Sequence, residues 1–395
     1  MRRLAVAGRP DWASLADGLG FTFHTSPAAP YWVEDACYAL TRRQVERDIT
    51  AATADAVAMC ARLLDRAACD DEILASLGIE RQWWDGIRDS WLRAEGTLYG
   101  RFDLAYDGRG AARILEFNAD VPGTLFESAH FQWHWFEALH ADGAVPRAAD
   151  QFNRLHEALV GAFRALAGQH AILHVAASLD DAEERCLARY LCDCACQSGR
   201  AVDLIDIGDI GIGAAGQWLD LDGRPITWLF KVYRWDLLLR EPFARFLGGE
   251  RAPQLVEPRW KMVLASKGIL AWLWRMFPRH PNLLPTWFED DPAADPGQSY
   301  VTKPLFSNRG ANVRIVSPEL PGGELSTGGP YGPERRVVQA YHRLPVFRSA
   351  AGERVHAVLG SWVVAGRPEG LAVYEDTGPI VGHATMRFVP HIVLP

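Results

Sequence analysis

Two carboxylates and a carboxamide lie close together in the stretch LYGRFDLAYDGRGAARILEFNAD. The stretch alternates between apolar and polar residues, breaks at DGRG and alternates again, which predicts a β-hairpin. Because neighbouring side chains of a strand point to opposite faces, Arg101 and Asp103 share one face of the first strand. Glu116 and Asn118 likewise share a face of the second strand, and the turn places Asp103 level with Glu116.

This polar face has the composition of a magnesium site. Carboxylate and amide oxygens are the ligands that Mg²⁺ prefers, and two carboxylates placed opposite each other repel without a cation. Arg101 beside them suits a phosphoryl or carboxylate group. We expect Phe102, Leu115 and Phe117 to lie behind this face. A solvated hairpin face whose charges are balanced by the arginine is the alternative.

Two lysines stand where phosphates could be held. Lys303 lies in the predicted strand YVTKPLF, just before a Ser307–Gly310 loop whose N–H groups could cover a nucleotide. Lys267 lies among apolar residues of a helix predicted from 258 to 277, and a lysine in such a setting needs a partner. For either lysine, an aliphatic stem lying on apolar surface with the ammonium in water is the simpler interpretation.

The remaining elements must position these side chains. Thr41 and Gln44 have the spacing of a capping box, which opens an amphipathic helix running to residue 64. Next come a predicted helix at 80–93 and a mainly helical segment at 124–167. A β-α-β unit is predicted within 171–230 and ends in a hairpin around Asp222–Gly223. A loop at 278–298, two strands within 300–316 and strands from 335 to 393 complete the prediction. The loops near 307–312 and 366–378 are candidate lids.

Composition excludes several classes of protein. The 395 residues are 49% hydrophobic and 23% charged, with a net charge of −8 and no basic tract, so nucleic acid is not an expected partner. No apolar run reaches the length of a signal sequence or a membrane span, which favours a cytoplasmic protein. Seven cysteines, an odd number in helical surroundings, argue against a disulfide framework. The GxGxxG pattern at 211–216 lacks the helix that a dinucleotide site needs. The oligomeric state stays open.

Several segments in one order resemble the glutathionylspermidine synthase family, from Tyr31 to His391. They are YWVEDACYALT, YGRFDLAYD, LEFNADVPGTLFE, VYRWDLLLREPF, EPRWKMVLASKGILAWLWRMFPRHPNLLP, YVTKPLFSNRGANVRIV, QAYHRLP and GSWVVAGRPEGLAVYED. The resemblance implies an α/β protein with an ATP-grasp fold and an associated pre-ATP-grasp unit. We expect four segments: 1–168 with the hairpin, 169–256 as the pre-ATP-grasp-like substrate unit, 257–335 as the lid region, and 336–395 completing the ATP-grasp sheet.

The resemblance also implies a set of site residues and two cofactors, ATP and Mg²⁺. The resemblance implies that Mg²⁺ is held by Asp103, Glu116 and Asn118, and that Arg101 faces an acyl phosphate. It implies that ATP is contacted by Lys267, Lys303 and Asn312 and, at the adenine pocket, by Gln339. It places Glu183 near the substrate groove. Acids at 180–184 could attract a cationic amine, although a solvated helix N-terminus explains them equally well.

The implied function is an ATP- and Mg²⁺-dependent carboxylate–amine ligase that forms an amide through an acyl phosphate. Its substrates would be a small carboxylic acid and an amine whose identities the sequence leaves open. Two departures bear on it: Val121–Gly123 replace serines that contact glutathione in the family, and Tyr374 replaces an arginine, for which Arg387 is a candidate substitute. The alternatives are a non-catalytic or substrate-divergent nucleotide-binding protein of the same fold, and an acid- or polyamine-binding module without ATP.

Overall fold

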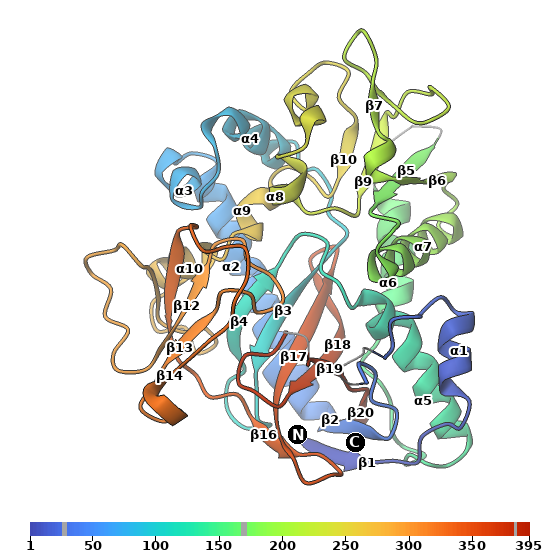
Figure 1. Ribbon diagram of the computed structural model, residues 1–395, viewed down its shortest axis with the longest axis vertical. Coiled ribbons are helices and arrows are strands. Elements are labelled where there is room, and N and C mark those ends of the chain that lie inside the picture. Colours follow the sequence, from blue (N-terminus) through green and yellow to red (C-terminus); the bar gives the residue numbers. More distant parts are fainter. Residues whose placement is uncertain (26–29, 167–171, 383–384) are drawn as a thin grey trace.

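The computed structural model describes residues 1–25, 30–166, 172–382 and 385–395 (Figure 1). It shows a mixed α/β protein with several sheets and helices packed around them, which confirms the predicted class. Among the described residues, no helix combines the length and apolar composition that crossing a membrane requires.

The strands of the described chain form five sheets. The central antiparallel sheet has the order β19 (Arg387–Phe388), β18 (Arg367–Asp376), β17 (Arg354–Val364), β3 (Tyr99–Ala105), β4 (Arg113–Asn118), with β16 (Val346–Arg348) paired to β17. A second antiparallel sheet has the order β11 (Thr286–Phe288), β15 (Arg336–Ala340), β12 (Tyr300–Pro304), β13 (Arg314–Val316), β14 (Glu324–Ser326). A parallel sheet has the order β10 (Gln254–Val256), β9 (Trp228–Lys231), β5 (Leu173–Ala177), β6 (Val202–Asp206). The smaller sheets are β1 (Arg2–Ala5), β2 (Ala36–Thr41), β20 (His391–Leu394), and β7 (Gly211–Ile212), β8 (Trp218–Leu219).

Helices surround these sheets. The α-helices are α1 (Trp12–Gly18), α2 (Ala51–Ala67), α3 (Asp71–Ser76), α4 (Trp84–Leu92), α5 (Gln132–Ala141), α6 (Leu155–Ala165), α7 (Ala182–Gln197), α8 (Trp235–Leu238), α9 (Lys261–Ala265) and α10 (Ile269–Met276). Shorter helical segments are η1 (Gln44–Thr50), η2 (Arg81–Trp83), η3 (Glu127–Phe131), η4 (Ile207–Asp209), η5 (Pro242–Phe246) and η6 (Pro321–Gly323). The predicted capping box is confirmed: Thr41 N–H donates to Gln44 Oε1 at 2.9 Å, and Gln44 N–H donates to Thr41 Oγ1 at 3.2 Å.

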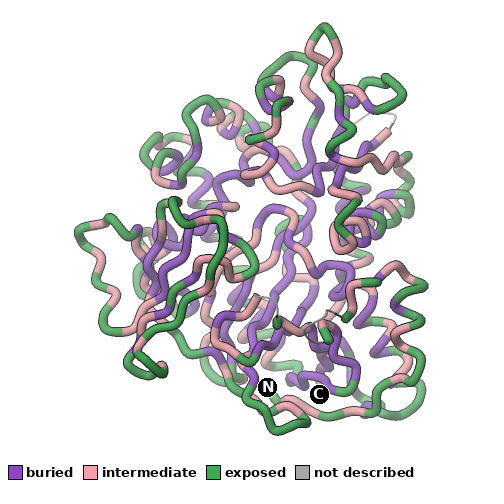
Figure 2. Tube along the Cα trace, in the orientation of Figure 1, coloured by how far each residue is buried: buried purple, intermediate pink, exposed green. Residues whose placement is uncertain are grey.

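The predicted hairpin is β3–β4, and it lies in the central sheet, whose strands are largely buried (Figure 2). Residues of β3 belong to the apolar cores on both faces of this sheet. Asp103 pairs with Glu116 as predicted, and Phe102 stacks on Phe117 behind them at 3.8 Å between ring centroids. The expected place of Leu115 was wrong, because Leu115 lines the cavity in front of the sheet. The register shifts after Asp103, so Leu115 is the extra residue of a β-bulge and leaves the simple alternation.

Two further predictions need correction. The predicted helix 258–277 is two short helices, because Ser266 is extended and Lys267 N–H donates to Leu305 O at 2.8 Å, at the end of β12. The hairpin predicted around Asp222–Gly223 is present but shorter than predicted. Leu219 bridges Pro225 in antiparallel pairing and Ile226 N–H donates to Trp218 O at 2.8 Å, after which β9 enters the parallel sheet.

Smaller differences concern segments that were expected to be loops. The predicted loop at 278–298 contains β11, and most of the candidate lid at 366–378 is the buried strand β18. The division into four segments stays a prediction. Strand β15 of the last segment pairs with β12 of the third, so these two segments share a sheet.

Two buried ion pairs fix the hairpin against the parallel sheet. Glu257, just after β10, accepts hydrogen bonds from the N–H groups of Leu98 and Tyr99 at 3.1 and 3.0 Å and pairs with Lys261 at 2.8 Å. Asp120, just after β4, pairs with Lys231 of β9 at 2.6 Å, and Lys231 is fully buried. These pairs hold the start of β3 and the segment after β4 at the edge of the α/β unit.

Candidate active site

Asp103, Glu116 and Asn118 lie side by side on the front face of the hairpin. Asn118 Nδ2 donates to Asp103 Oδ2 at 3.0 Å and to Glu116 Oε1 at 3.2 Å. Burial raises the pKa of Asp103, even though Arg101 opposes this shift. Two adjacent carboxylates need positive charge nearby, which Arg101 and Lys267 supply in this structure.

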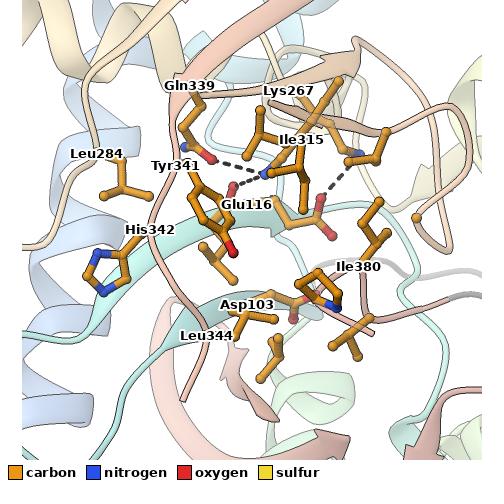
Figure 3. Close-up of a pocket in the computed structure, with 18 of the residues that line it drawn as sticks. Asp103, Glu116, Lys267, Leu284, Ile315, Gln339, Tyr341, His342, Leu344 and Ile380 are labelled. Carbon is orange, nitrogen blue, oxygen red and sulfur yellow. Dashed lines mark hydrogen bonds and ion pairs between the residues drawn. The ribbon is translucent and has the colours of Figure 1, made fainter. Parts of the chain in front are cut away.

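Two buried lysines face these acids from the neighbouring elements. Lys267 Nζ lies 3.4 Å from Glu116 Oε2 and donates to Ser307 O (Figure 3). Lys303 Nζ donates to Leu115 O at 2.9 Å and to Gln339 Oε1 at 3.0 Å. Burial lowers the pKa of Lys303 to about 8. Burial would raise the pKa of Glu116, but Lys267 and Lys303 lower it to about 2.

A cavity between the central sheet and the second antiparallel sheet joins these groups to an apolar wall (Figure 3). Its polar end carries Asp103, Glu116, Lys267 and Lys303. Its apolar wall includes Leu284, Val301, Ile315, Leu344, Val358 and Ile380, with Gln339 and Tyr341 among them. An apolar slot that ends in paired ammonium groups and carboxylates can take a flat ring at one end and phosphates at the other.

Arg101 is held tightly beside Asp103. Its Nε and Nη2 donate to Asp103 Oδ1 and Oδ2 at 2.6 and 3.1 Å, and its Nη1 donates to Gly123 O at 2.8 Å. Burial would lower the pKa of Arg101, but Asp103 raises it above its ordinary value. The arginine therefore stays charged and fixed by the residues around it.

A second acidic group lies next to Gly123, and sequence reasoning found only part of it. Glu183 at the start of α7 pairs with Arg309, and a Cβ on Gly123 would lie 2.5 Å from Glu183 Oε1. Glu127, which was missed, is 1% exposed and accepts a hydrogen bond from the Tyr31 hydroxyl at 2.6 Å. Burial raises the pKa of Glu127 to about 7, and the charge of Glu183 adds to the shift. An acid inside the apolar sequence LFESAHF was the available signal.

Two residues that were considered for the site lie elsewhere. Asn312 does not line the cavity; its Oδ1 accepts a hydrogen bond from Tyr331 N–H at 2.9 Å and so holds a neighbouring loop. Arg387 lies 3.3 Å from Glu375, which alternates to the sheet face opposite Tyr374. Arg387 therefore cannot take the place of an arginine at position 374.

One other cluster among the described residues has metal-binding side chains: His174, Asp203 and Asp220. Arg224 pairs with both aspartates, at 2.5 Å to Asp203 and 2.7 Å to Asp220. The arginine already supplies the positive charge there, so this cluster is an ion-pair network of the α/β unit.

Comparisons with known proteins found a family model and several relatives. The family model "Glutathionylspermidine synthase preATP-grasp" matches residues 3–394. A Haemophilus influenzae protein named "Putative acid--amine ligase" is 33% identical over 407 residues, covering 98% of both chains. Trypanothione synthetase of Crithidia fasciculata and the bifunctional glutathionylspermidine synthetase/amidase of Escherichia coli are each 26% identical. These matches cover 79% and 78% of this chain but only 50% and 52% of those longer proteins.

A solved structure shares the overall architecture. The glutathione synthetase-like effector of Globodera pallida, in its apo form, superposes with a TM-score of 0.58 at 12% identity, over 97% of this chain and 95% of that chain. At this identity the likeness concerns the fold alone.

Proposed function

We propose that this chain, which belongs to the glutathionylspermidine synthase family, uses ATP to join a carboxylic acid to an amine. Its fold is the one expected, an α/β architecture of ATP-grasp type with the pre-ATP-grasp unit that gives the family model its name. Its named relatives are ligases, and we assign it to the same class, the ATP-dependent C–N ligases.

The observation that carries this proposal is the single cavity in which buried Lys267 and Lys303 face Asp103 and Glu116 beside an apolar slot. The lysines are placed to bind the phosphates of ATP, and the slot, with Gln339, to bind the adenine. An oxygen of the acid attacks the γ-phosphorus, the bond to ADP breaks, and an acyl phosphate forms. The amine then attacks the acyl carbon, inorganic phosphate leaves, and the nitrogen loses a proton. The acyl phosphate must be kept from water, which would hydrolyse it.

The donor set fits a Mg²⁺ ion. Asp103, Glu116 and Asn118 offer hard oxygen atoms side by side, and a carboxylate oxygen that accepts one hydrogen bond keeps a further lone pair for a cation. Bound there, Mg²⁺ would neutralise charge on the transferred phosphoryl group. Arg101 and Lys267 hold Asp103 and Glu116, the two carboxylates that would face the metal.

We place the amine near Glu183 and Glu127. Glu183 lies against Gly123, whose carbonyl binds Arg101, and the charges of Glu183 and Arg101 both act on Glu127, so an amine held there would lie beside the reacting group. Gly123 leaves room for Glu183, where a side chain would collide with it. The sequence Val121–Gly123 does not favour glutathione as the acid. We expect small-molecule substrates and a cytoplasmic location.

The test replaces the two acids singly, with Asp103→Asn and Glu116→Gln, and measures ADP release with ATP, Mg²⁺ and mixtures of acids and amines. We expect each variant to lose at least about 100-fold in turnover, the scale of removing one group that stabilises transition-state charge. Asp107→Asn, an exposed acid in the turn of the same hairpin, is the matched control and should keep its activity. Near-normal turnover in both site variants would refute the assignment.

The alternative, a nucleotide-binding protein without turnover, is motivated by Tyr374, which is buried beside Arg101 where the family has an arginine. Calorimetry with ATP and Mg²⁺ separates the two. Binding without ADP release across a broad panel of acids and amines would favour the alternative.

A further inference from the structure

The guanidinium of Arg101 is almost fully used by the protein itself. Besides Asp103 and Gly123 O, it donates from Nη1 to Thr124 Oγ1 at 3.1 Å. In the described part of the chain these bonds use four of the five N–H groups that an arginine offers. Arg101 is also absent from the residues that line the nucleotide cavity, whereas Asp103 lines it. Arg101 therefore mainly binds neighbouring groups of the protein, and one of its N–H groups remains for a substrate.

Tyr374 completes this arrangement from strand β18. Its hydroxyl and Thr124 Oγ1 lie 2.6 Å apart in a buried hydrogen bond, so Thr124 links the tyrosine to the arginine. Arg101 Cζ also lies 5.0 Å from the centroid of the Tyr374 ring and 5.4 Å from that of Trp362, within the range of cation–π contact.

A glycine in the strand between them leaves space for the contact of Arg101 with Tyr374. Gly360 lies on β17, between the strands that carry Arg101 and Tyr374. A Cβ at this position would come within 2.7 Å of Arg101 Cδ and 2.9 Å of Tyr374 Cε2. The glycine lets the two side chains meet across the front of the sheet.

We propose that Tyr374 and Thr124 are positioning residues, which lock Arg101 so that its guanidinium holds the Asp103 carboxylate in place for the metal. Arg101 then acts on the metal site through Asp103. The tyrosine is then a working part of the site. The inference rests on the proposed function for its effect on turnover, but its effect on metal binding stands independently.

The physical reason is that a metal ligand must be oriented as well as present. Both oxygens of Asp103 accept hydrogen bonds from Arg101, and the arginine in turn is held by Gly123, Thr124 and the two aromatic rings. Loss of the groups that orient metal ligands typically costs about 10- to 100-fold in metal affinity or activity. Tyr374→Phe keeps the ring and removes only the hydroxyl, so it tests the bond to Thr124.

The experiment measures the dissociation constant of Mn²⁺ by calorimetry and the kcat and KM values for ATP at varied Mg²⁺. We expect Tyr374→Phe and Thr124→Val each to raise the Mn²⁺ dissociation constant and the half-saturating Mg²⁺ by about 10-fold or more, with the KM for ATP unchanged. The double variant should be no worse than Thr124→Val alone, because Thr124→Val already removes the contact with the Tyr374 hydroxyl together with the hydrogen bond from Arg101. Arg101→Lys should weaken Mn²⁺ binding too, since lysine cannot bridge both oxygens of Asp103.

Tyr38→Phe is the matched control. Tyr38 is also buried, and its hydroxyl donates a hydrogen bond to Glu375 at 2.9 Å. Glu375 follows Tyr374 on β18 and therefore points to the opposite face of the central sheet. Tyr38→Phe should lower the stability without changing Mn²⁺ affinity.

Three results would overturn the inference. They are wild-type Mn²⁺ affinity in Tyr374→Phe, loss of turnover in Arg101→Lys with unchanged Mn²⁺ affinity, or no Mn²⁺ binding by the wild-type protein. If wild-type protein binds Mn²⁺ but turns over no acid and amine, the proposed function fails, while the Mn²⁺ affinities of the variants still decide the positioning role.

Discussion

Glu127 gives a quantitative prediction about pH. The side chain is 1% exposed, bonded to the Tyr31 hydroxyl and close to the charge of Glu183, and burial raises its pKa from 4.5 to about 7. The hydrogen bond from Tyr31 and, more weakly, the charge of Arg101 oppose this rise in the pKa. The folded protein therefore keeps a proton on Glu127 at pH values where the unfolded chain has lost it.

The sign of the effect follows from proton linkage. Between pH 4.5 and about 7 the folded state binds more protons than the unfolded state, so the free energy of unfolding decreases as the pH rises through this window. At about 1.4 kcal/mol per pKa unit, the full shift corresponds to about 3 kcal/mol. Below pH 4.5 the group is protonated in both states and contributes no pH dependence.

The assay is urea unfolding of the wild-type protein and Glu127→Gln at pH 5 and pH 8. Glutamine still accepts the hydrogen bond from Tyr31 but cannot ionise. We expect the stability of Glu127→Gln relative to wild type to increase by about 2–3 kcal/mol between the two pH values. Glu137→Gln, an exposed acid on α5, should show no such change. Parallel pH profiles of wild type and Glu127→Gln would refute the reasoning.

Two further substitutions test the buried ion pair of Lys231 and the proposed nucleotide contact of Lys303. Lys231→Met leaves Asp120 buried without its partner and should lower the free energy of unfolding by about 3–5 kcal/mol. The double variant Lys231→Met/Asp120→Asn should recover most of this loss. An equal loss of stability in the double variant would contradict the prediction. Lys303→Met should weaken ATP binding in calorimetry by about 10- to 100-fold, the cost of one charged hydrogen bond. Because the pKa of Lys303 is about 8, wild-type affinity should fall as the pH rises past 8 while that of the variant does not; a pH-independent wild-type affinity would count against a role for its charge.

The hairpin could be predicted from sequence because its signals are local. Alternation and one turn fix the faces of Arg101, Asp103, Glu116 and Asn118. The structure confirms the predicted pairing of Asp103 with Glu116, and it also pairs Arg101 with Asn118. The bulge at Leu115 was missed because an extra residue leaves the apolar pattern almost unchanged. The roles of these residues in binding metal and nucleotide stay predictions.

The rest depends on contacts between distant parts of the chain. Lys267 lies in a break between two helices, because its N–H bonds to the end of β12, and the apolar periodicity of 258–277 gives no sign of that partner. Tyr31 and Glu127 are separated by 96 residues, so their contact could not be read from either segment. Arg387 was a reasonable substitute by type, but strand alternation places its partner Glu375 on the other face from Tyr374.

The buried pair of Asp120 and Lys231 has a consequence for dividing the protein. The two residues are 111 positions apart, and each neutralises the other where no water reaches. A gene cut between them would leave each fragment with a charge to bury and nothing to balance it. Neither fragment should be recoverable as a soluble, folded piece. A protease nick in the exposed stretch 289–298 separates neither this pair nor the hairpin from the α/β unit, so the nicked protein should hold together.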